Sequence, residues 1–158
     1  MKNKENTIYL LVIFLLLGID QLTKSAMQSL ANRIIGYSMH IFGNFFRLTY
    51  VENYGGIFGI FQGHIREFTI ISTILIIYIY VTELKNFNKY SSLTKLGVVF
   101  IISGALGNMI DRFFRGYVID MLDFRSVWQF VFNFADVYIH LGVYLIIISY
   151  IIRRSKKK

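Results

Sequence analysis

The sequence predicts an all-α membrane protein with four transmembrane helices and a small extracytoplasmic β-sheet and loop. The chain has 158 residues, of which 55% are hydrophobic, and a mean hydropathy of +0.53. Charged residues make up 16% of it, whereas soluble domains carry about a quarter. The apolar residues gather in four separate runs, and the basic residues gather in alternate segments between those runs. This pattern favours one integral membrane domain that covers residues 1–158.

The four apolar runs predict helices at about residues 7–30, 68–84, 93–112 and 136–152. A helix needs roughly 20 mostly apolar residues to cross a bilayer, so the polar ends of several runs must lie in the interface. Helices are the expected form of these spans, because lipid offers no hydrogen bonds to an exposed backbone. The runs also lack the two-residue alternation of a barrel strand. A cleaved signal peptide is the alternative for the first run. We retain it as a helix because an ionic pair follows it instead of a small-residue cleavage site.

The distribution of basic residues predicts that both termini are cytoplasmic. Ten Lys and Arg residues fall in three short segments: 2–4, 85–95 and 153–158. Short loops rich in Lys and Arg mark the cytoplasmic side of a bacterial membrane. The extracytoplasmic segments are then about residues 31–67 and 113–135. A basic chain can also bind nucleic acid, but in so apolar a chain the membrane is the better reason for the charge.

The two extracytoplasmic segments carry strand signals. Residues 45–53 (FFRLTYVEN) are rich in β-branched and aromatic side chains, which favour strands. Residues 116–119 and 127–134 alternate around a polar stretch and predict a hairpin. We therefore expect a small sheet on the outer face of the membrane.

The candidate functional side chains come from four separate segments but converge at this outer face. Asp20 and Lys24 lie four residues apart at the outer end of the first helix, where they can pair. The third helix ends with one stripe of small and polar residues at helical spacing. These residues are Gly104, Gly107, Asn108 and Asp111, followed by Asp120; Asn53 lies in the outer segment, and Asn133 and Asp136 begin the fourth helix.

Ionisable groups are costly inside a membrane and therefore point to function. For Asp20 and Lys24, a structural ion pair and a chemical role have equal support. Helix packing explains the glycines best, and Asp111 with Arg112 suits a polar network. Asp120 and Asp136 differ because neither has a cation at helical spacing. The strand pattern leaves Asp123 open as an alternative to Asp120.

Two carboxylates that share a poorly hydrated site cannot both ionise easily, so one of them keeps its proton. The ionised carboxylate can deprotonate water while the neutral one donates to a carbonyl oxygen, which is sufficient for peptide hydrolysis. The chain has no cysteine, which excludes a thiol nucleophile and thiolate metal sites. Ser25 and Lys24 are adjacent on a helix and do not face each other, which argues against a serine–lysine catalytic dyad. The histidines at 40, 64 and 140 lack the spacing of metal ligands.

Five motifs make the chain similar to lipoprotein signal peptidases, the signal peptidase II family. They occur in that family's order and extend over nearly the whole chain. The motifs are DQLTK at 20–24, NYGGIFG at 53–59, GALGNMIDR at 104–112, GYVID at 116–120 and FNFAD at 132–136. The family resemblance implies an aspartic endopeptidase with Asp120 and Asp136 as the catalytic pair, and it selects Asp120 over Asp123.

The resemblance also implies supporting residues and a substrate. Substrate-binding or supporting roles fall to Asn53, Gly55, Asn108, Arg112, Asn133, Asp20, Lys24 and Asp111. The substrate is a prolipoprotein whose cysteine carries diacylglycerol, cut just before that cysteine without any metal or cofactor. We expect a monomer that contacts membrane lipid and no nucleic acid. The chain departs from the family pattern at Gly56 and Ile57, where alanines are usual, and at Ser103, where glycine is common.

Two other functions are compatible with a small polytopic protein. A transporter or channel subunit would use acidic groups as a cation path and would place them through the whole membrane depth. The inner halves of the helices are nearly free of charge, which favours a site at one face. A purely structural assembly protein would need no pair of carboxylates.

Overall fold

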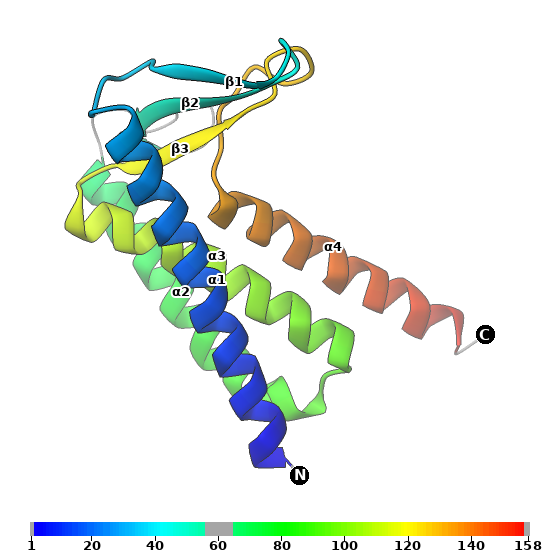
Figure 1. The fold of residues 1–158 in the computed structure, drawn as a ribbon. Coiled ribbons are helices and arrows are strands. Elements are labelled where there is room, and N and C mark those ends of the chain that lie inside the picture. The colour runs from blue at the N-terminus through cyan, green and yellow to red at the C-terminus, as the bar shows by residue number, and fades with distance from the viewer. Residues whose placement is uncertain (1, 56–64, 157–158) are drawn as a thin grey trace.

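The computed structural model describes residues 2–55 and 65–156, which form long helices below a small sheet (Figure 1). Gly56, Ile57 and His64 lie outside these described residues. The elements in chain order are α1 (Lys2–Leu30), β1 (Ser38–Phe42), β2 (Phe46–Asn53), α2 (Ile65–Asn86), the short 3-10 helix η2 (Phe87–Lys89), α3 (Ser92–Phe114), β3 (Val118–Asp123) and α4 (Phe134–Ser155). The four predicted helices are present, and each extends beyond its apolar run into polar residues.

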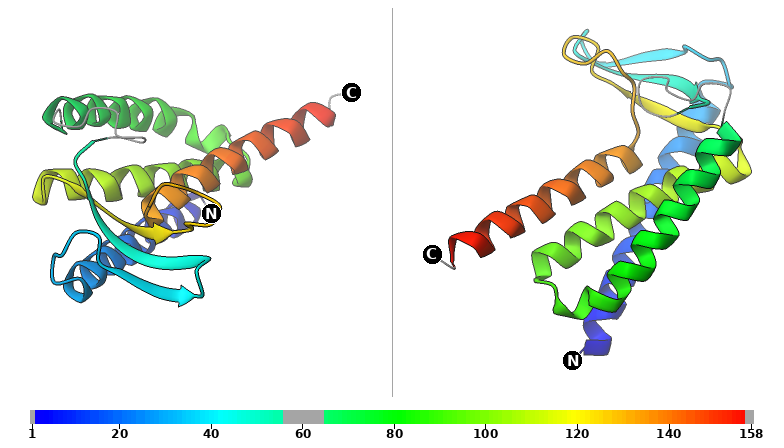
Figure 2. Two further views of the ribbon diagram at one scale, coloured as in Figure 1. Left: turned by 90° about the horizontal axis from the view of Figure 1, so that it is seen from above. Right: turned by 180° about the vertical axis from the view of Figure 1, so that it is seen from behind.

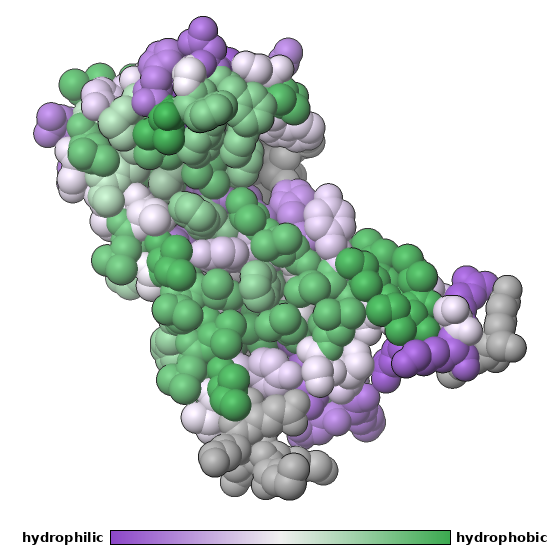
Figure 3. Space-filling view, turned by 45° about the vertical axis from the view of Figure 1, so that its right-hand side comes forward, coloured by the Kyte–Doolittle hydropathy of each residue, from purple (hydrophilic) through white to green (hydrophobic). Residues whose placement is uncertain are grey.

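Three of the described helices are long and apolar enough to cross a membrane. These stretches are Asn6–Leu30, Ser92–Phe114 and Phe134–Ser155, whereas the apolar part found in α2 is the shorter stretch Thr69–Ile79. Large apolar side chains project outward along the helices, and Figure 3 shows this apolar surface above a polar end near the C-terminus. A soluble protein rarely exposes so wide an apolar surface, so lipid is its natural surrounding.

Helix α3 contacts each of the other three helices and packs most closely against α4 (Figure 2). Small residues permit this approach. A Cβ atom on Gly97 would lie 2.8 Å from the carbonyl oxygen of Gly142, and one on Gly104 would collide with the carbonyl oxygen of Ala135. The glycine stripe predicted on the third helix is therefore a packing surface for the start of α4.

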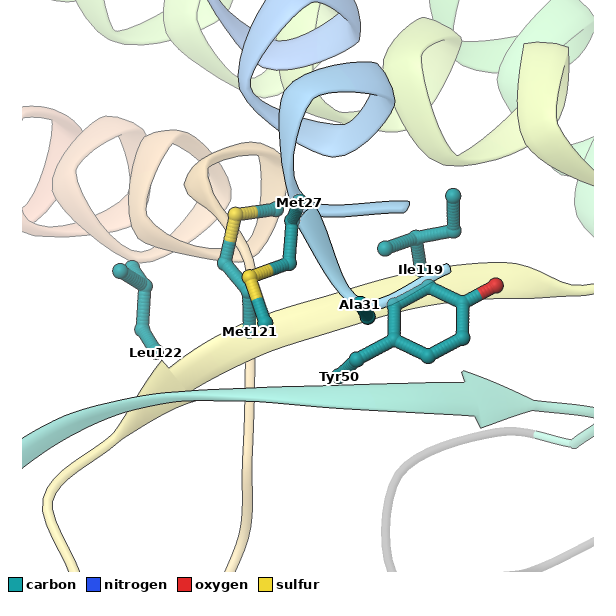
Figure 4. Close-up of a cluster of buried hydrophobic side chains, with 6 residues drawn as sticks. All are labelled: Met27, Ala31, Tyr50, Ile119, Met121 and Leu122. Atoms are coloured by element: carbon teal, nitrogen blue, oxygen red, sulfur yellow. The ribbon is translucent and has the colours of Figure 1, made fainter. Parts of the chain in front are cut away.

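The sheet has the order β1-β2-β3, is antiparallel throughout, and lies across the end of α1. The predicted strand at 45–53 is confirmed as β2. Figure 4 shows the small core between the sheet and α1. Its buried residues are Met27, Ala31, Tyr50, Ile119, Met121 and Leu122.

The predicted hairpin at 116–134 is only partly correct. Its first strand runs further than expected, to Asp123, because β2 is its partner and the side chains of Thr49 and Arg125 donate to the Asp123 carboxylate. Its second strand does not form. Residues 127–130 make an exposed loop, and pairing is limited to one bridge between Leu122 and Phe132.

A β-bulge in β2 sets which side chains face the site. Leu48 lies opposite Leu122, but Val51 lies opposite Asp120, so two residues of β2 stand against one residue of β3. Successive strand residues point to opposite faces, and one extra residue reverses the faces beyond it. Asn53, two residues after Val51, therefore shares the face of Asp120.

Candidate active site

Asp120 is held by two asparagine amides. Its side chain is 3% exposed, in the middle of β3. The Nδ2 atom of Asn53 donates to Oδ2 at 3.0 Å, and the Nδ2 atom of Asn133 donates to Oδ1 at 2.6 Å. The amide orientation of Asn53 is fixed because its Oδ1 atom accepts the backbone N–H of Gly55 at 3.0 Å. Both carboxylate oxygens of Asp120 thus have a donor.

Asp136 is positioned by the first turn of α4. Asn133 is the N-cap of this helix and forms a capping box with Asp136. The Oδ1 atom of Asn133 accepts the backbone N–H of Asp136 at 3.0 Å, and the backbone N–H of Asn133 donates to Oδ2 of Asp136 at 3.2 Å. Such caps satisfy helix N–H groups that have no partner within the helix. The same fully buried asparagine therefore contacts both aspartates.

Asn108 of α3 supplies the remaining contact to the pair. Its Nδ2 atom donates to Oδ1 of Asp136 at 2.8 Å, while its own Oδ1 atom accepts from Nζ of Lys24 at 3.0 Å. Four carboxylate oxygens, two on Asp120 and two on Asp136, each accept one N–H. A carboxylate oxygen has a second lone pair, so each can still accept or carry a proton.

Burial raises the pKa of Asp120 to about 7, and the negative charge of Asp136 acts in the same direction. The hydrogen bonds from Asn53 and Asn133 oppose this shift because they favour the ionised form. Near neutral pH, Asp120 is therefore poised to hold or release a proton, as general acid catalysis requires.

Lys24 is the centre of a buried ionic cluster beside the pair. Its Nζ atom lies 2.9 Å from Oδ2 of Asp20 and 2.9 Å from Oδ2 of Asp111. All three residues are fully buried. The predicted pair of Asp20 and Lys24 is thus present. Lys24 also pairs with a second carboxylate, Asp111, which the sequence assigned to a polar network with Arg112. The cluster also reaches the site, because Oδ1 of Asp20 accepts the backbone N–H of Ala135, the residue before Asp136.

Two residues of this cluster were missed at the sequence level. Gln21 donates to Asp20, to Asp111 and to the carbonyl of Gly107 at 3.1 Å each. Arg115 forms an ion pair with Asp111. The signal for Arg115 was available, since it lies four residues after Asp111, the spacing that predicted the first pair.

Arg112, the neighbour of Asp111, interacts electrostatically with three carboxylates: Asp136, Asp120 and Asp111. Its Nη1 atom donates to the carbonyl of Asn108 at 3.2 Å. Gly107 of α3 leaves room for the carboxylate of Asp20 on α1, because a Cβ atom on Gly107 would lie 2.5 Å from a carboxylate oxygen of Asp20.

Among the described residues, the rival candidates make no hydrogen bond to the carboxylates of Asp120 and Asp136. Asp123 accepts from Thr49 at 2.7 Å and from Arg125 at 2.8 Å. Ser25 accepts from Arg115 at 3.1 Å, and no hydrogen bond within the described part of the chain joins it to Lys24. His140 contacts the backbone carbonyl of Asp136, through Nδ1 at 2.8 Å, and not the carboxylate. Among residues that the structure describes, no group of three or more His, Asp or Glu side chains is placed to hold a metal ion.

A family model described as signal peptidase (SPase) II matches residues 12–152. The chain belongs to the signal peptidase II family. The family resemblance found in the five motifs is therefore confirmed, and this signal peptidase II chain is a protease with membrane helices.

Relatives match over nearly their whole length. A lipoprotein signal peptidase of Fusobacterium nucleatum is 46% identical over 154 residues, which cover 98% of this chain and 92% of that protein. A lipoprotein signal peptidase of Clostridioides difficile is 40% identical over 151 residues, which cover 96% and 99%. A bacterial membrane enzyme solved by the in meso method has a TM-score of 0.82 at 31% identity, covering 96% of this chain and 92% of that one.

Ser103, one departure from the signal peptidase II pattern, fits without loss of a hydrogen bond. It is fully buried in α3, and its hydroxyl donates to the carbonyl of Val99 at 2.7 Å. Its small side chain is therefore accommodated inside the helix packing with its hydroxyl hydrogen-bonded. The departures at Gly56 and Ile57 fall outside the described residues.

Proposed function

We propose that this chain is an aspartic endopeptidase that removes the signal peptide from diacylglyceryl-modified prolipoproteins. It cleaves just before the lipidated cysteine, with Asp120 and Asp136 as the catalytic pair. The observation that supports this most directly is Asn133, which contacts both carboxylates from the start of α4. The relatives named lipoprotein signal peptidases support the same substrate class.

The chemistry follows from the unequal protonation of the pair. Asp120, whose pKa burial raises to about 7, holds the proton and donates it to the scissile carbonyl oxygen. Ionised Asp136 accepts a proton from water, and the resulting hydroxide attacks the carbonyl carbon. In the second step, Asp136 gives that proton to the departing amine nitrogen, the C–N bond breaks, and the new carboxyl group returns a proton to Asp120. No metal or cofactor takes part.

We propose that the pair lies at the outer surface of the membrane. With both termini cytoplasmic, the outer ends of α1 and α3 and the start of α4 bring their polar residues to the extracytoplasmic face of the bacterial cytoplasmic membrane. The substrate's lipid chains then enter sideways from the outer leaflet. Membrane lipid is the surrounding of the exposed apolar helix surfaces, including α2, which we propose as the fourth span, and the chain acts as a monomer without nucleic acid.

A cleavage assay on a lipidated precursor tests this function. The purified full chain is compared with Asp120→Asn, Asp136→Asn and the double variant, and Asp123→Asn serves as a matched control on the same strand. We expect each site variant to lose about 10³-fold or more in kcat, with the double variant little worse, because the two groups act as a unit. Substantial cleavage by either single variant contradicts the pair. Chelators should leave the activity unchanged, and inhibition by them would indicate a metal site instead.

A further inference from the structure

Glu52 holds the hydroxyl groups of two tyrosines at the end of β2. Its Oε1 atom accepts from Tyr50 and its Oε2 atom accepts from Tyr54, both at 2.7 Å, and a third tyrosine, Tyr117, also favours the ionised form of this carboxylate. The amide of Gln28 donates to Tyr50 at 3.3 Å and to Tyr117 at 2.9 Å. Donors and acceptors match, since the hydroxyl protons of Tyr50 and Tyr54 go to Glu52 and the amide hydrogens of Gln28 go to hydroxyl lone pairs. We name these five residues the tyrosine clamp.

The clamp favours an ionised Glu52. Burial by itself would raise the pKa of Glu52, but the hydrogen bonds from Tyr54, Tyr50 and Tyr117, together with the charge of Arg33, lower it below its usual range. Hydrogen bonds to an ionised acceptor are about twice as strong as neutral ones. The carboxylate thus holds its partners firmly although it is only half-buried.

The clamp joins three parts of the chain beside the site. Gln28 belongs to α1, Glu52 to β2, and Tyr117 directly precedes β3. The ring centroids of Tyr54 and Tyr117 lie 5.3 Å apart, which adds a packing contact between the two strand ends. The ends of β2 and β3 are therefore held together on the face of the sheet where Glu52 lies.

The opposite face of the same strand ends carries the hydrogen bond to the site. Asn53 follows Glu52 and pairs with Val118, and Glu52 itself pairs with Ile119. Asp120 comes next on β3 and accepts from Asn53. The side chains of Glu52 and Asn53 point to opposite faces of the sheet, but the two residues are consecutive in the chain. A shift of the clamp therefore moves Asn53 relative to Asp120.

We infer that Glu52 is a positioning residue for the peptidase reaction: by gathering the tyrosine hydroxyls, it fixes the end of β2 so that the Asn53 amide reaches Asp120. It touches neither the reacting atoms nor the carboxylate pair. This inference rests on the proposed function, since it assumes that Asp120 takes part in cleavage.

The experiment measures kcat, KM and the pH profile of cleavage of a lipidated precursor by the full chain. Glu52→Ala should lower kcat about 10- to 100-fold, the range that small misplacement of a catalytic group produces, with KM within about twofold, because a misplaced acid affects the chemical step. It should also move the alkaline limb of the profile to higher pH, as we expect of Asn53→Ala. The Asn53 variant removes, and the Glu52 variant weakens, a hydrogen bond that favours ionised Asp120. Glu52→Gln, which keeps one acceptor oxygen, should recover part of kcat.

The double variant Glu52→Ala/Asn53→Ala decides whether Glu52 acts through Asn53. If it does, the double variant is no slower than Asn53→Ala alone. Losses that multiply, or a Glu52→Ala variant with wild-type kcat and pH profile, overturn the inference. If Glu52→Ala fails to fold, Tyr54→Phe replaces it, because this variant removes only one hydroxyl from an exposed ring. It should shift the pH profile in the same direction by a smaller amount. An unchanged pH profile counts against the clamp.

Two controls separate this inference from the proposed function. Asp123→Asn makes the same carboxylate-to-amide change at the other end of the sheet and should leave the pH profile unchanged. If Asp120→Asn retains activity, the proposed function fails. If Asp120→Asn is inactive and Glu52→Ala behaves as wild type, the positioning role alone fails.

Discussion

Asn133 donates its side-chain amide to Oδ1 of Asp120 at 2.6 Å while its side-chain oxygen caps the helix that carries the second aspartate. One residue thus performs two separable tasks: it stabilises the start of α4, and it holds Asp120. Their separation gives a direct test of whether the observed contact matters for cleavage.

Asn133→Ala should lose both tasks, and Asn133→Ser should lose one. Alanine removes the cap, which costs about 1 kcal/mol of stability, and it removes the donor to Asp120. Serine is a good N-cap, but its side chain lacks the amide that reaches Asp120. We expect thermal unfolding in detergent to show a lower Tm for the alanine variant than for the serine variant, and cleavage assays to show low activity for both. Full activity of Asn133→Ser would show that the contact to Asp120 is dispensable.

The pH dependence should follow the proton of Asp120. Because the pKa of Asp120 is raised to about 7, the neutral acid is present below that pH and is lost above it. Cleavage should therefore decline on the alkaline side as pH rises through about 7. A profile that rises steadily up to pH 9 would contradict a protonated Asp120.

The raised pKa of Asp120 also predicts that the stability of the fold changes with pH. The unfolded chain ionises Asp120 near pH 3.9, whereas the folded chain ionises it near pH 7. The contribution of Asp120 to stability is thus fully present below about pH 4 and is lost as pH rises to about 7. Asp120→Asn should lack this component, so the Tm difference between wild type and variant should change between pH 4 and 7 and stay constant above. A difference that is flat across this range contradicts the raised pKa.

Lys24→Met should destabilise the fold more than Asp20→Asn. Asp20, Lys24, Asp111 and Arg115 balance to zero charge, and removing the lysine leaves two buried carboxylates close together with one partly exposed arginine. Breaking a buried pair in this way costs about 3–5 kcal/mol. The double variant Asp20→Asn/Lys24→Met leaves only Asp111 with Arg115, so its Tm should recover part of the loss. A double variant as unstable as Lys24→Met would show that the charge balance does not set the stability.

Local patterns predicted the helices, the strand β2 and the pairing of Asp20 with Lys24, because each depends on residues close in sequence. The face of Asn53 could not be predicted in this way. Unbroken alternation along β2 would put Asn53 on the face opposite Leu48. The pairing of β2 with β3 creates the bulge between Leu48 and Val51, and this bulge brings Asn53 to the face that Leu48 shares with Asp120. The contact of Asn133 with Asp120 likewise depends on how α4 packs beneath the sheet, which no local pattern contains.

The orientation of the chain can be tested with single cysteines, because the sequence has none of its own. Ser126 lies in the exposed loop after β3, and Ser155 lies exposed at the end of α4, so both should react without disturbing a buried contact. Ser38 and Ser91, from the predicted outer and inner segments, are less suitable because both side chains are part-buried and hydrogen-bonded. With both termini cytoplasmic, Ser126→Cys should react with an impermeant thiol reagent in intact cells, and Ser155→Cys should react only after the membrane is opened. The opposite labelling pattern would place Asp120 and Asp136 on the cytoplasmic face, where they could not meet an exported precursor, and the proposed protease function would fail.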